Sequence, residues 1–392
     1  MDYEPVIGLE IHVQLRTLSK MFCRCGADYQ DATPNTRVCP VCLAMPGVLP
    51  VVNRRAVEWA MKIGLALNCK IARVTNFDRK NYPYPDLMKG YQISQYDSPI
   101  AFDGWMDLPD IEEAKGPVRI GINRVHMEED VARLVHVPES NGEYGYTLMD
   151  VNRAGVPLME VVSEPDIRSA DQAEAYILNL QSIIRYLGVG TANMEEGSFR
   201  CDANVSVRPK GSQDLWNRVE IKNMNRVRAV MRAIEYECDR QINLYRTDKR
   251  VTQETRGWDD NRQITVSHRS KEEAHDYRYF PEPDLPPLDI DHKWVEEIRT
   301  SLPEMPQERR LRFQNTLGLS EYDASLLTAD HSTADYFESV LDARTQQSVD
   351  VNTFAKETAN WLNGEMARLL NENESTGGIS AVKIRPENLA QL

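Results

Sequence analysis

Residues 5–15, with the sequence PVIGLEIHVQL, alternate without interruption between two kinds of side chain. Every odd-numbered residue from 7 to 15 is apolar, and the even-numbered positions in between are Gly8, Glu10, His12 and Gln14. A period of two indicates a strand that buries one face, so Glu10 and His12 lie about 7 Å apart on the other face. One cation or phosphate group is within reach of both. A solvated strand face that carries a glutamate and a histidine by chance is the alternative for this segment alone.

The same alternation recurs in later segments. Residues 198–209 put apolar side chains on one face and Arg200, Asp202 and Asn204 on the other, and residues 218–223 continue as a hairpin partner that carries Lys222. Two more extended segments, 120–130 and 148–162, add further acidic residues: Glu128, Glu129, Asp130, Asp150 and Glu160. We therefore expect a sheet with one apolar face and one carboxylate-rich face. Because like charges repel, such a face is typical of a site for a cation or a basic partner.

The overall composition limits the class of protein. The chain has 392 residues, of which 41% are hydrophobic, enough for two or three domains with cores. The sequence has no run of about 18 apolar residues and no charged-then-apolar start, so we expect a cytoplasmic protein without a membrane segment. A net charge of −14 argues against a uniformly nucleic-acid-binding surface. Local basic clusters, at 218–232 and among aromatic residues at 79–85, are typical either of RNA contact or of a solvated face.

Four of the seven cysteines form two close pairs. Cys23 and Cys25 are separated by one residue, and Cys39 and Cys42 follow after a thirteen-residue spacer in the motif CPVC. Such pairs suit tetrahedral zinc, and four thiolates complete the coordination shell, which indicates a structural ion rather than a catalytic one. Disulfides are the alternative, but the odd total of cysteines and the lack of a secretion signal argue against them.

Helical patterns first separate the strands and then replace them. Amphipathic runs predict helices that begin near Asn53, Ser169 and Val227, the first two of them at capping residues. Residues 282–291, EPDLPPLDID, predict a proline-rich linker, and strand patterns are absent beyond it. The expected fold class is therefore α+β. We expect an antiparallel-sheet cradle domain over residues 1–291, with flanking helices and a zinc-binding loop at 21–44, followed by an all-helical domain over 292–392.

Several common catalytic motifs are missing from the sequence. It contains no G-x-x-x-x-G-K-[ST] loop, no G-x-G-x-x-G after a strand, no G-x-S-x-G elbow and no H-E-x-x-H helix. Their absence argues against the P-loop, Rossmann, serine-hydrolase and zincin classes. The pattern that remains is an acidic, metal-binding sheet close to cationic and aromatic loops.

A series of sequence blocks, in order from residue 5 to about 288, resembles the signature blocks of the GatB family. This family comprises the B subunits of the tRNA-dependent aspartyl/glutamyl-tRNA(Asn/Gln) amidotransferases. The blocks are IGLEIHVQL, KMFCRC, CPVCLAMPGVLPVVN, FDRKNYPYPDLMKGYQISQYDSPI, RVHMEEDVARL, VNRAGVPLMEVVSEPDIRS, MEEGSFRCDANVSVRP, VEIKNMN and DYRYFPEPDLPPL. The helical remainder resembles the middle domain of the family. The family usually continues into a helical tail domain that contacts the tRNA body, and this chain ends at Leu392, so the tail is expected to be missing.

The resemblance implies a ligase reaction that depends on ATP and Mg²⁺. The side-chain carboxylate of the amino acid on Glu-tRNA(Gln), Asp-tRNA(Asn) or both is phosphorylated, and ammonia then displaces the phosphate. The ammonia comes from a partner amidase subunit, GatA, and a small subunit, GatC, completes the assembly. An acidic, histidine-bearing face suits this chemistry, because a metal ion there would bridge phosphates and the acyl carboxylate.

The resemblance also implies roles for individual residues. It places the catalytic magnesium ion on four of them: Glu10, His12, Glu129 and Glu160. The alternation of the 120–130 segment is irregular and does not by itself choose between Glu128 and Glu129. Because magnesium prefers oxygen ligands, His12 also makes manganese or zinc an acceptable occupant.

Other polar residues are candidates for substrate contact. Arg200, Asp202, Asn204 and Lys222 are expected to contact phosphates or the aminoacyl group. Lys80, Tyr82 and Tyr84 are expected to receive the terminal adenosine of the tRNA by stacking, and a surface loop held by its prolines is the alternative.

Two functions from other classes remain open from the residues alone. One is a non-catalytic zinc-knuckle protein that binds RNA or serves as a scaffold, and the other is a metal-dependent hydrolase or ligase of small molecules. Histidine and carboxylates on several separate strands argue against a scaffold, because a docking surface needs no such convergence. A small-molecule enzyme would act without RNA.

Overall fold

The computed structural model of the chain describes residues 2–108, 118–138, 144–267, 277–344, 350–372, 379 and 382–391. The chain forms two compact units. The first unit comprises Met1–Gln181 and Val189–Ser301, and the second comprises Ser182–Gly188 and Leu302–Leu392. Helix α4 (His292–Thr300) therefore belongs to the first unit, although the sequence places it just beyond the expected boundary at 291.

A nine-stranded sheet forms the framework of the described part of the first unit, in the order β14-β13-β12-β11-β1-β10-β7-β6-β2. The strands are β1 (Tyr3–Gln14), β2 (Lys70–Ile71), β6 (Ala101–Leu108), β7 (Val118–Glu129), β10 (Pro157–Ser163), β11 (Phe199–Pro209), β12 (Val219–Met224), β13 (Glu254–Asp259) and β14 (Ile264–Ser267). Neighbouring strands are antiparallel except β12 and β13, which are parallel. Strand β1 lies at the centre and pairs with β10 on one side and β11 on the other.

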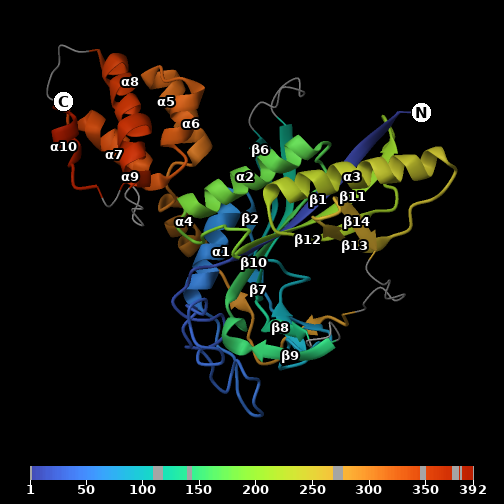
Figure 1. The fold of residues 1–392 in the computed structure, drawn as a ribbon. Coiled ribbons are helices and arrows are strands. Elements are labelled where there is room, and N and C mark those ends of the chain that lie inside the picture. Colours follow the sequence, from blue (N-terminus) through green and yellow to red (C-terminus); the bar gives the residue numbers. More distant parts are fainter. Residues whose placement is uncertain are drawn as a thin grey trace. The chain divides into compact units, whose positions relative to one another are not determined.

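The alternation along β1 and β11 is confirmed. Ile7, Leu9 and Ile11 are completely buried, as are the corresponding apolar residues of β11 from Phe199 to Val207, apart from a 1% exposure of Cys201. Helices α1 (Arg54–Ala66) and α3 (Val227–Arg246) cover this apolar face together with the part of α2 (Ala170–Tyr186) that belongs to the first unit (Figure 1). The face that carries Glu10 and His12 points away from these helices.

Side-chain caps set the ends of the helices as the sequence predicts. The side chain of Asn53 accepts the backbone N–H of Arg55 at 2.9 Å and begins α1. Ser169 Oγ accepts the N–H of Gln172 at 3.2 Å at the start of α2, and Gly188, with a φ of 67°, follows its end.

Small sheets and a hairpin complete the first unit beside the large sheet. Strands β4 (Asp78–Asn81), β5 (Tyr91–Ser94) and β15 (Phe280–Pro281) form one sheet, and β3 (Val74–Thr75) pairs with β16 (Leu288–Asp289). Strands β8 (Arg133–Pro138) and β9 (Tyr144–Asp150) form a hairpin that leads into the 3-10 helix η1 (Val151–Arg153).

The proline-rich segment 282–291 is packed against the first unit, so the prediction of a linker there is wrong. Glu282 is 3% exposed and accepts two hydrogen bonds from the guanidinium of Arg79, both at 2.7 Å. The backbone N–H of Ile290 donates to the carbonyl of Arg73 at 2.7 Å. The backbone N–H of Glu282 donates to the carbonyl of Phe77 at 2.8 Å, and β16 pairs with β3.

The described part of the second unit is helical. Its elements after Leu302 are α5 (Pro306–Leu317), α6 (Glu321–Leu327), α7 (His331–Asp342), α8 (Val351–Trp361), the π-helix η2 (Leu362–Met366), α9 (Ala367–Glu372) and α10 (Pro386–Leu389). Phe313, Phe337 and Ala355 are among the completely buried residues of its own core. None of the helices in the described ranges of the chain is long and apolar enough to cross a membrane.

Candidate functional site

Two histidines and two glutamates meet on the polar face of the large sheet. His12 of β1 lies opposite Glu160 of β10, and Glu160 lies opposite His126 of β7. Glu128 follows on the same face of β7, two residues beyond His126. The His12 Nε2 atom lies 3.3 Å from a Glu160 oxygen and 3.7 Å from a Glu128 oxygen, and His126 Nε2 lies 3.2 Å and 3.5 Å from the same two carboxylates.

Three of these side chains fit a divalent cation. One ligand atom from each of His12, Glu128 and Glu160 can be chosen so that all three lie within 4.8 Å of one another. Glu128 is oriented by hydrogen bonds from Ser94 Oγ at 2.6 Å and Gln92 Nε2 at 3.3 Å, the kind of support that fixes a metal ligand. An imidazole with two carboxylates suits manganese or zinc, and magnesium less strongly. We call His12, Glu128 and Glu160 the acidic triad.

The histidines and glutamates of this group shift one another's pKa values toward the charged forms. Burial by itself lowers the pKa of His126, but Glu160 and Glu128 outweigh burial and raise it to about 9. The same two carboxylates raise the pKa of His12 against the effect of burial. In return, the histidines hold the pKa of Glu160 well below its usual range, although burial opposes them, and Lys80 helps to lower that of Glu128 to about 2. Without a cation, a protonated His126 offsets part of the negative charge of the two carboxylates.

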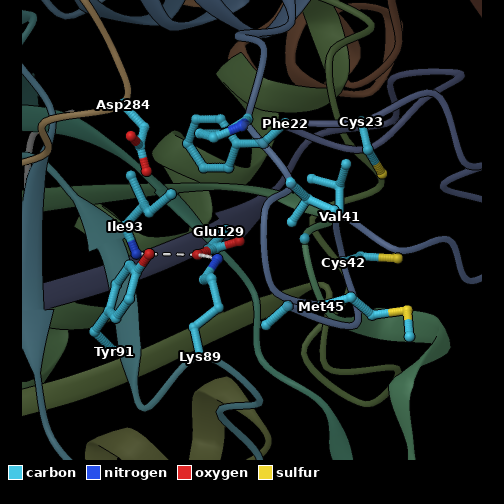
Figure 2. Close-up of a pocket in the computed structure, with 14 residues that line it drawn as sticks. Phe22, Cys23, Val41, Cys42, Met45, Lys89, Tyr91, Ile93, Glu129 and Asp284 are labelled. Carbon is cyan, nitrogen blue, oxygen red and sulfur yellow. Dashed lines mark hydrogen bonds and ion pairs between the residues drawn. The ribbon is translucent and has the colours of Figure 1, made fainter.

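The structure brings Glu128, rather than Glu129, into this group. The side chain of Glu129 points to the other side of β7, where it forms an ion pair with Lys89 and accepts the backbone N–H of Ile93 at 3.0 Å (Figure 2). The choice of Glu129 as metal ligand therefore does not match the geometry. The physical reason is an irregularity in β7: Val162 pairs with Arg124 but Ser163 pairs with Ile122, so Asn123 is an extra residue that shifts the alternation.

Glu10 lies beside the acidic triad without belonging to it. It accepts a hydrogen bond from Asn204 Nδ2 at 2.9 Å and faces Asp202 across the strand pair. Asp202 is in turn paired with Lys222 at 3.2 Å. Burial raises the pKa of Glu10, and Glu160 and Glu220 raise it further. The sequence-predicted residues Glu10, Asp202, Asn204 and Lys222 therefore form a continuous polar strip across β1, β11 and β12.

Arg200 borders a large cavity next to His12. The cavity has a volume of about 940 Å³ and is lined in part by basic side chains: Arg133, Arg153, Arg200 and Lys222. The Arg200 guanidinium is held at its inner end by the buried carboxylate of Asp130 at 2.9 Å. Asp130 also accepts Gln14 Nε2 at 2.6 Å and lies 3.6 Å from Arg153.

Of the three residues expected to stack a base, Lys80 and Tyr82 lie together. Lys80 Nζ is 6.0 Å from the ring centre of Tyr82 and 5.1 Å from that of Tyr277. Burial alone would lower the pKa of Lys80, but Glu128 raises it, so the ammonium stays charged near the acidic triad. Tyr84 is 51% exposed.

Sequence reasoning missed His126 and the supporting role of Asp130. His126 is 4% exposed, and its Nδ1 atom has no hydrogen-bond partner in the described part of the chain. Val125 and Met127 are fully buried, so their alternation was the signal that could have placed His126 and Glu128 together on the polar face. The extra residue at Asn123 hides this signal when the segment is read from its start.

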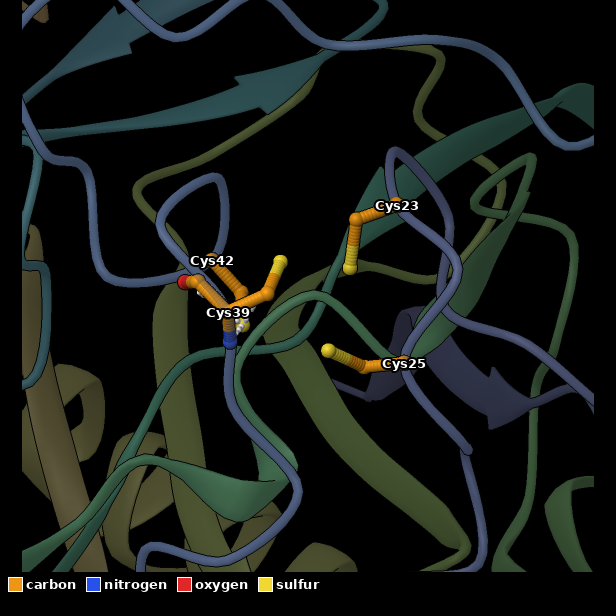
Figure 3. A group of neighbouring side chains, drawn as sticks. All are labelled: Cys23, Cys25, Cys39 and Cys42. Atoms are coloured by element: carbon orange, nitrogen blue, oxygen red, sulfur yellow. Dashed lines mark hydrogen bonds between the residues drawn. The ribbon is translucent and has the colours of Figure 1, made fainter.

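The four cysteines 23, 25, 39 and 42 come together as the spacing predicts (Figure 3). Their sulfur atoms all lie within 4.8 Å of one another, which fits one tetrahedrally bound zinc ion. The backbone N–H of Cys39 donates to Cys42 Sγ at 3.1 Å. A hydrogen bond from the Cys23 thiol, supported by this N–H, lowers the pKa of Cys42 to about 4, so a thiolate is already favoured there.

Comparison with known proteins shows the family of the chain. Residues 5–296 match the family described as the GatB/GatE catalytic domain. The B subunit of the aspartyl/glutamyl-tRNA(Asn/Gln) amidotransferase of Dehalococcoides mccartyi strain CBDB1 is 56% identical over 391 residues, and the match spans 100% of this chain and 78% of that protein. The corresponding subunits of Carboxydothermus hydrogenoformans and Moorella thermoacetica are 51% and 52% identical, with 100% of this chain and 78% and 79% of those proteins covered. The chain therefore belongs to the GatB/GatE catalytic domain family.

Proposed function

We propose that the chain is the B subunit of an ATP-dependent aspartyl/glutamyl-tRNA(Asn/Gln) amidotransferase. In this proposal it phosphorylates the side-chain carboxylate of glutamate or aspartate on a misacylated tRNA and then directs ammonia to the activated carbonyl. The names of relatives that are 51–56% identical support the reaction class. The observation that carries the proposal is the acidic triad, in which two carboxylates and an imidazole from three strands converge.

The acidic triad and the residues around it would bind different parts of the substrates. His12, Glu128 and Glu160 would hold a divalent cation, Mg²⁺ in the cell, which when bound would neutralise phosphate charge and polarise the phosphoryl group that the substrate carboxylate attacks. Lys80 would contact the transferred phosphate, because its charge already interacts with Glu128 and Glu160. Arg200, anchored on Asp130, would orient the acceptor end of the tRNA in the 940 Å³ cavity.

The proposal extends to partners and to zinc. Ammonia would come from a separate amidase subunit, GatA, with GatC as the third subunit, and the complex would act in the cytoplasm on charged tRNA. The four-cysteine cluster would hold a structural Zn²⁺ that fixes the loop between β1 and α1.

Two substitutions on β1 test the proposal. Glu10→Gln and His12→Ala should fold, because the buried face with Ile7, Leu9 and Ile11 is unchanged. We expect tRNA-dependent ATP hydrolysis and ammonia-dependent amidation to fall at least about a hundredfold in His12→Ala, which removes a ligand of the acidic triad, and to fall less in Glu10→Gln, which lies beside it. Glu4→Gln, on the same strand but paired with Arg208, is the matched control and should keep full activity.

The measurement is ATP hydrolysis and amide formation by the assembled complex with each misacylated tRNA in turn. Wild-type rates in His12→Ala at saturating Mg²⁺, with a native melting temperature, would show that the acidic triad is not the reaction centre. ATP hydrolysis that proceeds equally without tRNA would instead favour an enzyme of small molecules.

A further inference from the structure

The segment between the two cysteine pairs reaches the large cavity beside His12. It comprises residues 26–38, and a zinc ion on the four cysteines would join its two ends (Figure 3). Tyr29 of this segment lines the 940 Å³ cavity together with Arg153 and Arg200. The segment contains no helix or strand, so contacts with its surroundings must fix its position. We call residues 26–38 the zinc-closed segment.

A chain of hydrogen bonds connects the zinc-closed segment to Arg200. The Tyr29 hydroxyl donates to Gln14 Oε1 at 3.0 Å, and Gln14 Nε2 donates to Asp130 Oδ2 at 2.6 Å. The Arg200 guanidinium donates to the same Asp130 oxygen at 2.9 Å. Because an ionised carboxylate only accepts hydrogen bonds, Gln14 must present its amide nitrogen to Asp130 and its oxygen to Tyr29. Gln14 and Asp130 are buried, so the middle of the chain of bonds is shielded from water.

A second set of bonds connects the zinc-closed segment to Arg153. Asn35 Oδ1 accepts the backbone N–H of Val151 at 2.8 Å. The side chain of Asn152, which is completely buried, accepts the backbone N–H of Arg37 at 2.7 Å. Val151 and Asn152 belong to η1 and directly precede Arg153, so these bonds set where the Arg153 side chain begins.

Arg153 and Arg200 meet at one carboxylate. Arg153 Nε lies 3.6 Å from an Asp130 oxygen, and Arg200 Nη2 lies 2.9 Å from the other oxygen of the same group. Arg153 also donates to the carbonyls of Val131 at 2.9 Å and Ala132 at 3.0 Å. Both guanidinium groups belong to residues that line the cavity, and guanidinium groups suit the phosphate oxygens of RNA. The zinc-closed segment therefore supports two candidate phosphate contacts through separate sets of bonds.

From these contacts we propose that the zinc-closed segment positions Arg153 and Arg200 for the acceptor end of the tRNA, so that zinc bound at the four cysteines strengthens tRNA binding without taking part in the reaction. Joining the two ends of the segment removes conformational freedom before the RNA binds, and less ordering is then left for the binding step. Tyr29 and Asn35 are positioning residues, because they act through Arg200 and Arg153. This role rests on the proposed function, which puts the acceptor end in this cavity.

Removing one hydroxyl tests the connection to Arg200. Tyr29→Phe keeps the ring and takes away the donor to Gln14. In ammonia-dependent amidation by the assembled complex, we expect KM for the misacylated tRNA to rise about fivefold with kcat unchanged, because a hydrogen bond that orients a binding residue is lost. The zinc content should equal that of the wild type. Tyr336→Phe removes a hydroxyl that donates to the carbonyl of Ile384 at 2.9 Å in the second unit, and this matched control should keep the wild-type KM.

A double-mutant cycle shows whether Tyr29 acts through Arg200. Arg200→Ala by itself should raise the Kd of the complex for misacylated tRNA. Adding Tyr29→Phe to Arg200→Ala should raise it no further, because the side chain that the hydroxyl orients is gone. A further loss in the double variant, of the same size as in Tyr29→Phe alone, would show that Tyr29 contacts the RNA directly and would overturn its positioning role.

Reversible removal of zinc tests the segment as a whole. With a zinc-selective chelator and Mg²⁺ in excess, we expect the Kd of the complex for misacylated tRNA to rise at least about tenfold and added Zn²⁺ to restore it, because both sets of bonds depend on the closed segment. Tyr29→Phe combined with Asn35→Gly weakens both connections while zinc stays bound, and glycine tolerates the φ of 61° at Asn35. In this double variant, zinc removal should change the Kd far less than in the wild type.

The contrary outcomes separate this role from the proposed function. An unchanged KM in Tyr29→Phe, or a tRNA affinity that does not respond to zinc in a folded complex, overturns the role of the zinc-closed segment alone. A lower kcat with unchanged KM in Tyr29→Phe also overturns it, because the hydroxyl would then act in the chemistry. Wild-type complex that forms no amide on any misacylated tRNA overturns both this role and the proposed function.

Discussion

The most informative residues of the site are those whose charges cannot be separated. His12 and His126 each lie within 3.7 Å of both Glu128 and Glu160, so two imidazoles and two carboxylates contact one another in a largely buried place. Burying such charges is costly unless they are paired or bound to a metal. The group is therefore already arranged for a cation, which would replace protons as the source of positive charge.

A pair of adjacent glutamates provides a sharp test at the same scale. Glu128→Gln should weaken Mn²⁺ binding at least about tenfold, because it removes one anionic ligand of the acidic triad. Glu129→Gln should leave Mn²⁺ binding intact and cost about 1–3 kcal/mol of unfolding free energy, because it breaks the ion pair with Lys89. Calorimetric titration and urea denaturation distinguish the two. Weaker Mn²⁺ binding in Glu129→Gln, with intact binding in Glu128→Gln, would identify Glu129 as the ligand.

The raised histidine pKa values give the cation affinity a definite pH dependence. With its pKa raised to about 9, His126 is protonated at neutral pH in the metal-free chain, and His12 is shifted in the same direction. His12 must lose its proton to bind a cation. Affinity for Mn²⁺ should therefore increase as pH rises toward 9, with proton release detectable in buffers of different ionisation enthalpy. Affinity that does not change with pH would contradict this.

The same shift sets the stability of the metal-free chain. A folded pKa above the unfolded value of about 6.5 contributes stability that is complete below 6.5 and is lost as pH rises through about 9. The melting temperature in chelator should therefore fall over this range, and saturating Mn²⁺ should suppress the fall.

At the scale of elements, the loop between β1 and α1 depends on its four cysteines. The loop contains no helix or strand, and Asn53 connects its start to its end by donating to the carbonyls of Ser19 at 3.0 Å and Lys20 at 3.2 Å while capping α1. A bound zinc ion would supply the remaining constraint.

Replacing one cysteine should loosen the loop without unfolding the rest of the chain. We expect one zinc per wild-type chain, and Cys39→Ser should lose it and loosen residues 21–44 while the helices of the second unit stay folded. Cys238→Ala, a buried cysteine of α3 outside the cluster, is the control and should retain zinc. Metal analysis and limited proteolysis give the answer. A disulfide among the four cysteines in freshly purified reduced protein would count against the prediction.

The end of β7 is fixed by a buried carboxylate. Burial raises the pKa of Asp130, but Arg200 and Arg153 outweigh burial and lower it. Such a lowered pKa contributes stability above the unfolded value of about 3.9, and this contribution is lost as pH falls through the folded value. Asp130→Asn should cost about 1–3 kcal/mol at neutral pH, below the range for fully buried pairs because Arg200 is partly exposed.

The pH dependence separates this effect from a simple packing defect. The difference in urea midpoint between wild type and Asp130→Asn should shrink as pH falls below about 4. Asp103→Asn, which removes an exposed ion pair with Lys70, is the control and should change stability by at most about 0.5 kcal/mol. A difference that is constant with pH would assign Asp130 a purely steric role.

At the scale of the whole molecule, the described residues include a candidate site for amidation but no evident nucleophile that could release ammonia from glutamine. Within the described residues, every cysteine lies either in the four-cysteine cluster or, as with Cys69, Cys201 and Cys238, in a buried position. Burial raises the pKa of each of these three thiols, so none is an activated nucleophile.

This arrangement predicts dependence on a partner. The isolated chain should show no glutaminase activity, and it should copurify with an amidase subunit whose addition makes amidation glutamine-dependent. With free ammonia, the need for glutamine should disappear. Glutamine hydrolysis by the chain alone would contradict the prediction.

Much of the fold and site could be predicted from local sequence. The alternation of β1 and β11, the caps at Asn53 and Ser169 and the pairing of the four cysteines all depend on neighbours within a few residues. The comparison with known proteins confirms the family that the sequence blocks indicate. The prediction of a linker at 282–291 was wrong, because prolines interrupt regular structure without preventing tertiary packing.

Tertiary structure alone decided which residues of different strands meet. The alternation along β1 predicts that the side chain of His12 points away from the apolar core, because successive side chains of a strand point to opposite faces of the sheet. It cannot tell that β1 lies between β10 and β11, which start at Pro157 and Phe199 and bring Glu160 and Arg200 beside His12. One extra residue at Asn123 then decides for Glu128 over Glu129, because strand register is set by hydrogen-bonded partners and not by the strand's own sequence.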